Sequence, residues 1–159
     1  MDLFAGLCER LAENYANLET KIESENDINY FVIVNPFWEE NIKISTEDGI
    51  VFYFSFQHAH FDFSNNIDDN INYLIDYIDD FLEEKRAVIE FLEGDENLFG
   101  GDRPIDYIDT TSAELLLKSF IGGDPEAYES YAARFKGVSL HCSLRSWSGR
   151  FNKDFDFVL

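Results

Sequence analysis

Residues 41–61, NIKISTEDGIVFYFSFQHAHF, decide the fold class of this chain. Residues 41–45 alternate polar and apolar side chains, and residues 50–61 are rich in aromatic and β-branched side chains, so both segments favour strands. Asp48-Gly49 stands between them, and this dipeptide is typical of a tight hairpin turn. The sequence therefore predicts an antiparallel hairpin over residues 41–61.

Helices and further strands surround the hairpin. Apolar residues that recur every three to four positions, together with Ser, Thr and Asp-Pro start signals, predict helices; these cover residues 2–22, 67–82, 112–120 and 125–135. Further strands are predicted over residues 28–34, 86–94, 98–101 and 138–147. The pattern predicts an α+β fold, a mostly antiparallel sheet with helices packed mainly on one face, in a single domain spanning residues 1–159.

The composition is that of a folded chain. Hydrophobic residues make up 45% of its 159 residues, and 16 Phe, 8 Tyr and 2 Trp are among them, which excludes general disorder. Cys8 and Cys142 lie far apart, with no Cys-x-x-Cys pair, so we expect reduced, buried thiols. The first residues contain neither a signal peptide nor a membrane-spanning run, so a cytoplasmic protein is expected.

The charge is strongly negative and unevenly distributed. The formal net charge is −20, and residues 1–100 hold 23 Asp and Glu against 5 Lys and Arg. Such a field repels nucleic acid and anionic membranes, so neither is expected as a partner, whereas a basic protein would be attracted. The alternative is that the charge serves solubility alone.

His58, His60 and Asp62 occupy alternate positions at the end of the predicted hairpin. Alternate residues of a strand share a face, and imidazole with carboxylate is a normal ligand set for zinc, manganese or iron. However, a third or fourth ligand is missing, because the only other histidine, His141, lies beside Cys142 in another predicted strand. We therefore expect no metal and no cofactor, and interpret these residues as polar side chains that face solvent or a partner.

Other catalytic patterns are absent from the sequence. There is no Gly-x-Ser-x-Gly motif, and His141 and Cys142, as neighbours in a strand, would point to opposite faces. No pair among the 32 acidic residues stands out as a general acid and base. The sequence predicts no catalytic residue.

The helix over residues 67–82 has one apolar stripe, and its other face is acidic. No Lys or Arg occurs between Asp62 and Lys85 to neutralise that face. Like charges four residues apart destabilise a helix by a few tenths of a kcal/mol per pair. We therefore expect the acidic face to have a role, such as contact with a partner, that offsets this destabilisation.

Several segments together resemble a known family. These are the aromatic strand that ends in His-x-His-Phe-Asp, the acidic helix that follows, the strand RAVIEFLEG and the late segment LRSWSGRF. Over residues 41–102 and 138–156 the chain resembles small bacterial immunity proteins of polymorphic toxins. The helical segment 111–135 has no counterpart in that pattern.

The resemblance implies a cytoplasmic, non-enzymatic inhibitor that occludes the active site of a cognate bacterial toxin. Many such toxins are nucleases with basic clefts, which an acidic protein can block through fast, salt-sensitive association. We expect the partner contacts on one surface, made by Asp69, Asp76, Asp80, Glu84, His58, His60 and Asp62. Two alternatives stay open, a small metal-dependent hydrolase that uses His58, His60 and Asp62, and an acidic adaptor protein.

Overall fold

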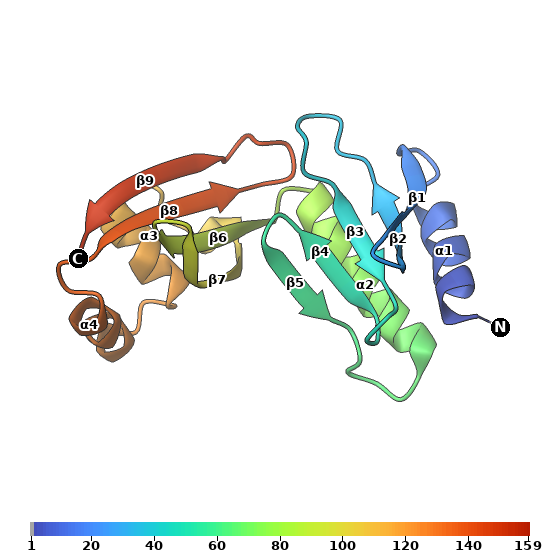
Figure 1. Cartoon of the computed structure of the whole chain (residues 1–159), viewed down its shortest axis with the longest axis horizontal. Helices are drawn as coiled ribbons and strands as arrows, with labels where there is room; N and C mark the ends of the chain where they lie inside the picture. The colour runs from blue at the N-terminus through green and yellow to red at the C-terminus, as the bar shows by residue number, and fades with distance from the viewer. Residues whose placement is uncertain (1) are drawn as a thin grey trace. The chain divides into compact units, whose positions relative to one another are not determined.

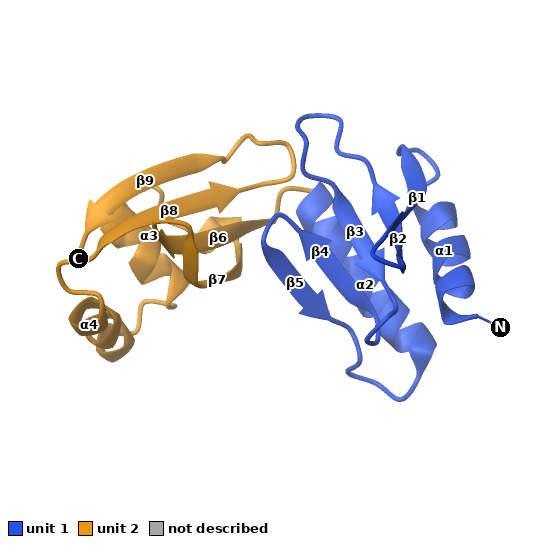
Figure 2. Cartoon of the chain, viewed as in Figure 1, with its two compact units in different colours: residues 1–82 blue, residues 83–159 orange. Residues whose placement is uncertain are grey.

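The computed structural model describes residues 2–159, and its chain divides into two compact units (Figures 1 and 2). Unit 1 ends at Leu82, and unit 2 spans Glu83–Leu159. Over the described residues the chain forms four α-helices and two antiparallel sheets, of five and four strands. The predicted α+β class is confirmed, with the strands in two sheets rather than one. A single domain over residues 1–159 stays a prediction.

Unit 1 is a five-stranded antiparallel meander with two helices. Its elements are α1 (Leu3–Asn14), β1 (Thr20–Glu25), β2 (Ile28–Ile33), β3 (Ile42–Ser45), β4 (Val51–Phe54), β5 (Gln57–His60) and α2 (Ile67–Leu82). The strands pair in chain order, β1-β2-β3-β4-β5. The predicted hairpin over residues 41–61 is present as the pair β3 and β4.

Two boundaries in unit 1 differ from the sequence prediction. The first helix ends at Asn14, and residues 20–25, whose start was expected to be helical, form β1 instead. The cause is the turn after β1, where Asn26 and Asp27 both adopt positive φ, the backbone of a two-residue hairpin turn. That turn pairs β1 with β2. The backbone of residues 20–25 therefore forms hydrogen bonds with β2 instead of continuing the first helix.

The predicted strand over residues 50–61 is two strands. Ser55, with a φ of 54°, and Phe56 turn the chain so that Phe54 pairs with Gln57 across a hairpin between β4 and β5. Neither residue is a glycine or a proline, so the sequence pattern does not indicate a turn within this aromatic run. As a result, His58 lies beside Tyr53 and His60 beside Val51.

Both helices of unit 1 are held by specific contacts. Phe81 of α2 stacks on Phe52 of β4, with ring centroids 5.3 Å apart, so α2 covers the sheet face that bears Phe52. α1 runs beside α2, where Tyr15 donates its hydroxyl hydrogen bond to Asp79 over 3.0 Å. At the start of α2, the side-chain oxygen of Asn66 accepts a hydrogen bond from the backbone N–H of Asp68.

Unit 2 is a four-stranded antiparallel sheet with two helices. Its elements are β6 (Arg86–Glu93), β7 (Glu96–Pro104), the 3-10 helix η1 (Ile105–Tyr107), α3 (Ala113–Phe120), α4 (Pro125–Arg134), β8 (Ser139–Arg145) and β9 (Lys153–Val158). The strand order is β7-β6-β8-β9. The side chains of Ser112 and Asp124 accept hydrogen bonds from backbone N–H groups and cap α3 and α4.

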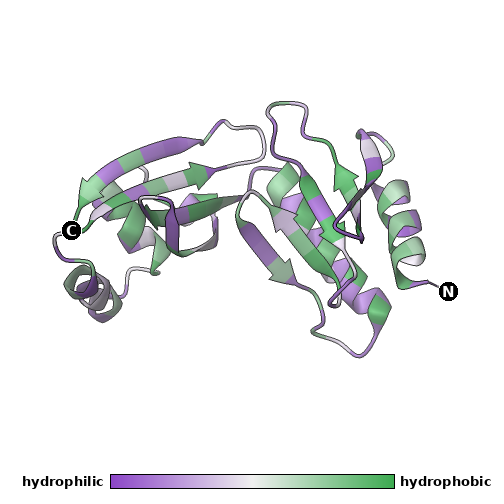
Figure 3. Cartoon of the chain, viewed as in Figure 1, coloured by the Kyte–Doolittle hydropathy of each residue, from purple (hydrophilic) through white to green (hydrophobic). Residues whose placement is uncertain are grey.

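One face of the second sheet builds the core of unit 2. Leu116, Leu117 and Phe120 of α3 pack there against Phe91 and Cys142. The C-terminal tail forms β9 and adds Phe151, Phe155 and Phe157 to this core. Figure 3 shows hydrophilic and hydrophobic colour alternating along β8 and β9, as expected for a sheet with one buried face.

No helix within residues 2–159 combines the length and apolar character that crossing a membrane requires.

Candidate functional site

The structure places the predicted acidic residues and the predicted histidines on opposite faces of the first sheet. Phe52 faces α2, and its cross-strand partner on β5 is Ala59. His58 and His60 flank Ala59 along β5 and therefore point to the other face. The two groups do not form the single surface that we expected.

The histidines belong to a row of rings across the open face of the first sheet. Tyr30 meets Tyr53 edge-on at 5.9 Å between centroids, Tyr53 lies 6.5 Å from His58, and His58 lies 5.9 Å from His60. Lys43 lies over the Tyr30 ring at 5.5 Å. Asp62 follows β5 and is exposed. Within residues 2–159 no three His, Cys, Asp or Glu side chains are grouped in a way that could hold a metal ion.

Contacts with α1 and with Tyr15, which follows it, engage one flank of α2. Arg10 pairs with Asp68 at 3.2 Å and donates to Asn72 at 3.0 Å, while Tyr15 binds Asp79. Local sequence patterns do not indicate the pairing of Arg10 with Asp68, because the two residues are 58 positions apart. The acidic face of α2 is therefore smaller than its sequence indicates.

The opposite flank of α2 keeps an acidic stripe. Asp69, Tyr73, Asp76 and Asp80 follow one another at spacings of four, three and four residues, which places them on one side of the helix. Asp69 and Asp76 are exposed, and Asp80 is half-buried. Three of the four predicted helix acids thus share one surface.

An exposed aromatic pair lies on the same flank. Phe63 and Tyr73 meet edge-on, with ring centroids 6.3 Å apart, although 73% of Phe63 and 52% of Tyr73 are exposed. Phe63 also contacts the buried Phe61, which in turn contacts Tyr77 of α2. The pair is therefore fixed to the core and open to solvent. We call the set Phe63, Asp69, Tyr73, Asp76 and Asp80 the acidic flank.

The sequence interpretation missed both aromatic residues of the acidic flank. Tyr73 could have indicated a contact surface from the sequence alone, because it is a large ring on the otherwise polar side of an amphipathic helix. Phe63 gives no such signal, since it follows Phe61 in an aromatic run. Only the fold shows that one ring is buried and the other exposed.

Glu84 does not belong to the acidic flank, contrary to the prediction. It lies in unit 2 with a positive φ of 60°, and its Oε1 accepts a hydrogen bond from the backbone N–H of Ser148 at 2.5 Å. Its Oε2 is buried without a hydrogen-bond partner among the described residues. The helix has ended by this position, so the helical spacing that suggested an exposed acid does not apply.

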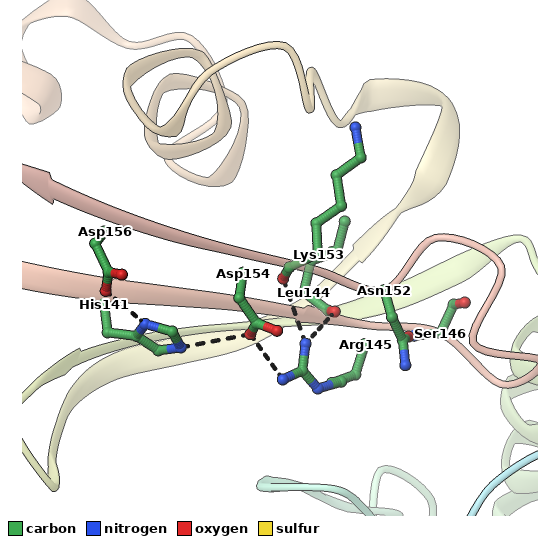
Figure 4. Close-up of polar contacts among 8 residues, drawn as sticks. All are labelled: His141, Leu144, Arg145, Ser146, Asn152, Lys153, Asp154 and Asp156. Atoms are coloured by element: carbon green, nitrogen blue, oxygen red, sulfur yellow. Dashed lines mark hydrogen bonds and ion pairs between the residues drawn. The ribbon is translucent and has the colours of Figure 1, made fainter.

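The open face of the second sheet carries a separate polar cluster (Figure 4). Nδ1 of His141 lies 2.8 Å from Asp156, and its Nε2 lies 3.4 Å from Asp154, which also accepts from Arg145 at 2.7 Å. Burial raises the pKa of Asp154, but the hydrogen bond and charge of Arg145 outweigh it and hold that pKa below its usual value. Arg145 and Asp154 form an ion pair, and His141 contacts both Asp154 and Asp156.

Neither cysteine is placed as a nucleophile. Cys142 lies in the core of unit 2 while His141 points to the open face, as predicted for neighbours in a strand. Burial raises the pKa of the Cys142 thiol to about 12, and burial with the nearby Asp2 raises that of Cys8 to about 11. Both thiols are free; Cys142 is buried and Cys8 half-buried.

The acidic flank lies in the more strongly charged unit. Residues 1–82 hold 17 Asp and Glu against 3 Lys and Arg, a net charge of −14. Residues 83–159 hold 15 against 9, a net charge of −6. Unit 1 therefore generates most of the negative field around the protein.

Comparisons of the chain with models of protein families, with curated proteins and with solved structures find no match.

Proposed function

We propose that this chain is a non-enzymatic binding protein that neutralises a basic protein by covering its functional site, in the manner of an immunity protein and its cognate bacterial toxin. The observation that carries the proposal is the acidic flank. It combines two exposed, fixed aromatic rings with carboxylates on the same side of α2. The resemblance of the sequence to immunity proteins supplies the specific form of the proposal.

The aromatic pair fits the centre of a protein interface. Large rings contribute much of the binding free energy in protein complexes, and Tyr is enriched among such residues. The face of an aromatic ring also attracts Arg and Lys side chains, by about 0.5–1 kcal/mol at exposed sites. Phe63 and Tyr73 can therefore accept both apolar and cationic groups of a partner.

The carboxylates fit the rim of such an interface. Asp69 and Asp76 are exposed, so their contribution to affinity is modest, but their field accelerates the approach of a basic partner. The net charge of −14 on unit 1 acts in the same direction. The same field opposes contact with nucleic acid or an anionic membrane. As an immunity-type inhibitor, the protein would act in the cytoplasm.

No observation favours a second function. His58 and His60 point away from the acidic flank, and the described residues offer no third metal ligand beside them, as a metal-dependent hydrolase would need. An adaptor protein in which the charge serves only solubility would not need the exposed pair Phe63 and Tyr73. We therefore assign the partner contacts to the acidic flank.

The test is co-expression with the domain encoded by the reading frame immediately upstream of this gene, which the proposal expects to be a toxin. The wild-type chain is expected to restore growth, and the double variant Phe63→Ser/Tyr73→Ser is expected to restore it less. Phe37→Ser/Tyr107→Ser is the matched control, because it removes one exposed Phe and one exposed Tyr elsewhere. Failure of the wild-type chain to bind or neutralise that domain would refute the proposal.

A further inference from the structure

Arg103 is a half-buried cation with no acidic partner. Five basic side chains have no carboxylate within 4.0 Å in the part of the chain that the structure describes: Arg103, Arg134, Lys136, Arg150 and Lys153. Four of them are exposed to water, and Arg103 alone is not. In a chain with 32 Asp and Glu, a half-buried cation without a carboxylate partner calls for a physical explanation.

The guanidinium of Arg103 is fixed in place. Its Nε donates to the carbonyl oxygen of Phe120 at 2.8 Å, and its Nη1 donates to that of Asp102 at 2.7 Å. The group also lies over the Phe120 ring, 4.4 Å from the centroid. Both acceptors are neutral carbonyls, so these contacts orient the guanidinium without cancelling its charge. Nη2 takes no part in either bond.

Arg103 lines a cavity of about 490 Å³ within unit 2. Pro104, Tyr107 and Leu115 supply apolar walls, and 76% of Tyr107 is exposed. Gly122 and Gly123, both with positive φ, form another wall after α3. The cavity is therefore mainly apolar with a fixed cation in its lining.

The other polar groups of the cavity are already engaged. Lys118 pairs with Glu114 at 2.7 Å. Ser119 donates to the carbonyl of Leu115 and accepts from the backbone N–H of Asp109. Asp109 accepts from Thr111, and these hydrogen bonds lower the pKa of its carboxyl. Arg103 is thus the cation of the lining that no carboxylate pairs, and Asp109, whose hydrogen bond comes from a neutral N–H group, keeps its negative charge in the same lining.

We propose that this cavity binds a small organic carboxylate, with the carboxylate on Arg103 and the apolar body against Tyr107 and Leu115. Its volume lies within the range of small-molecule sites, and such sites are mainly apolar with a few fixed polar groups. A planar guanidinium matches a carboxylate in shape and charge better than an ammonium does. This inference is independent of the proposed function, because the acidic flank lies in unit 1.

The test uses 3-phenylpropionate as the probe and nitrogen-15 NMR of the full chain as the readout. Saturable shifts are expected at the Arg103 Nε–H group and at the backbone amides of Gly122 and Gly123. The alcohol 3-phenylpropan-1-ol lacks the charge and acetate lacks the apolar body, so each is expected to bind at least about tenfold more weakly. No saturable shift at these groups, or equal binding of the alcohol, would overturn the proposal.

Variants separate binding at Arg103 from a general charge effect. Arg103→Gln is expected to weaken binding of 3-phenylpropionate by about tenfold or more, whereas Arg150→Gln removes the same charge from an exposed position and is expected to leave it unchanged. Tyr107→Ser alters an exposed wall and no core residue, so it provides a second test should Arg103→Gln fail to fold. Unchanged affinity in Tyr107→Ser, or in a folded Arg103→Gln, would contradict the assignment.

Discussion

Phe63 and Tyr73 meet edge-on on the surface of unit 1, at an interplanar angle of 77°, and more than half of each side chain stays exposed. Contiguous exposed apolar groups are a feature of surfaces that bind a partner, whereas single exposed rings are common on any protein. The pair lies beside Asp69 and Asp76 on one flank of α2. This arrangement, rather than the histidine motif, is the structural basis of the proposed binding function.

The double variant Phe63→Ser/Tyr73→Ser is expected to weaken binding to the toxic domain by at least about 2 kcal/mol, mainly through faster dissociation. The melting temperature is expected to change little, because both rings are mostly exposed. Surface plasmon resonance and thermal unfolding check the two parts. An equal loss of affinity in the control Phe37→Ser/Tyr107→Ser would contradict a specific role for the pair.

Tyr15 should make stability depend on alkaline pH. Burial, then the charge and hydrogen bond of Asp79, raise the pKa of Tyr15 far above its usual value. The stabilisation is therefore complete below about pH 10, the usual tyrosine pKa, and is lost as the pH rises above it. At pH 8 we expect Tyr15→Phe to lower the free energy of unfolding by about 1 kcal/mol.

The difference in the free energy of unfolding between wild type and Tyr15→Phe is expected to narrow between about pH 9 and 11. Over this range the phenol of Tyr15 ionises in the unfolded wild-type chain and stabilises that state, and the Phe variant has no such group. Urea unfolding at several pH values measures it. If this difference stays constant or widens over the range, Tyr15 is not the cause of the pH dependence of stability.

Glu84 is expected to stabilise the start of unit 2. Glu84→Ala removes the acceptor for the Ser148 N–H, and its loss is expected to cost about 1–3 kcal/mol in the free energy of unfolding. Glu84→Gln keeps an oxygen acceptor and should cost less. The neighbouring Glu83→Ala removes an exposed ion pair with Lys85 and is expected to cost less than about 1 kcal/mol. Equal unfolding midpoints of the two alanine variants in urea would refute this role.

Both thiols should resist modification in the folded protein. With pKa values raised to about 11 for Cys8 and about 12 for Cys142, few thiolates exist at pH 8. Labelling with a disulfide reagent is expected to be slower than in denatured protein by at least about a hundredfold, and slowest at Cys142. The single variants Cys8→Ser and Cys142→Ala assign the two rates. A thiol that reacts as fast in the folded state as in denaturant would disprove its burial.

Hydrophobic periodicity predicted most helices and strands, because it reports local burial. It failed where a turn lacked its usual residues, as at Ser55-Phe56, and where apolar spacing continued beyond the helix into β1. The site was predicted only in part. Asp69, Asp76 and Asp80 follow from helical spacing, whereas the pairing of Arg10 with Asp68 depends on packing between distant segments.

The histidines illustrate the same limit of local pattern. Alternation correctly placed His58 and His60 on one face of a strand. Alternation does not show which face of the sheet α2 covers. The contact of Phe52 with Phe81, two residues far apart in the chain, places α2 on one face and leaves the histidines on the other.

The association rate constant of this chain with the toxic domain, measured as a function of salt, tests the central claim most directly. Asp69→Lys/Asp76→Lys is expected to slow association at least about tenfold at low salt and to flatten its salt dependence. The control Glu93→Lys/Asp95→Lys makes the same charge change at exposed positions in unit 2 and is expected to have a smaller effect. Equal slowing by the two variants, or none by either, would contradict a partner surface on the acidic flank.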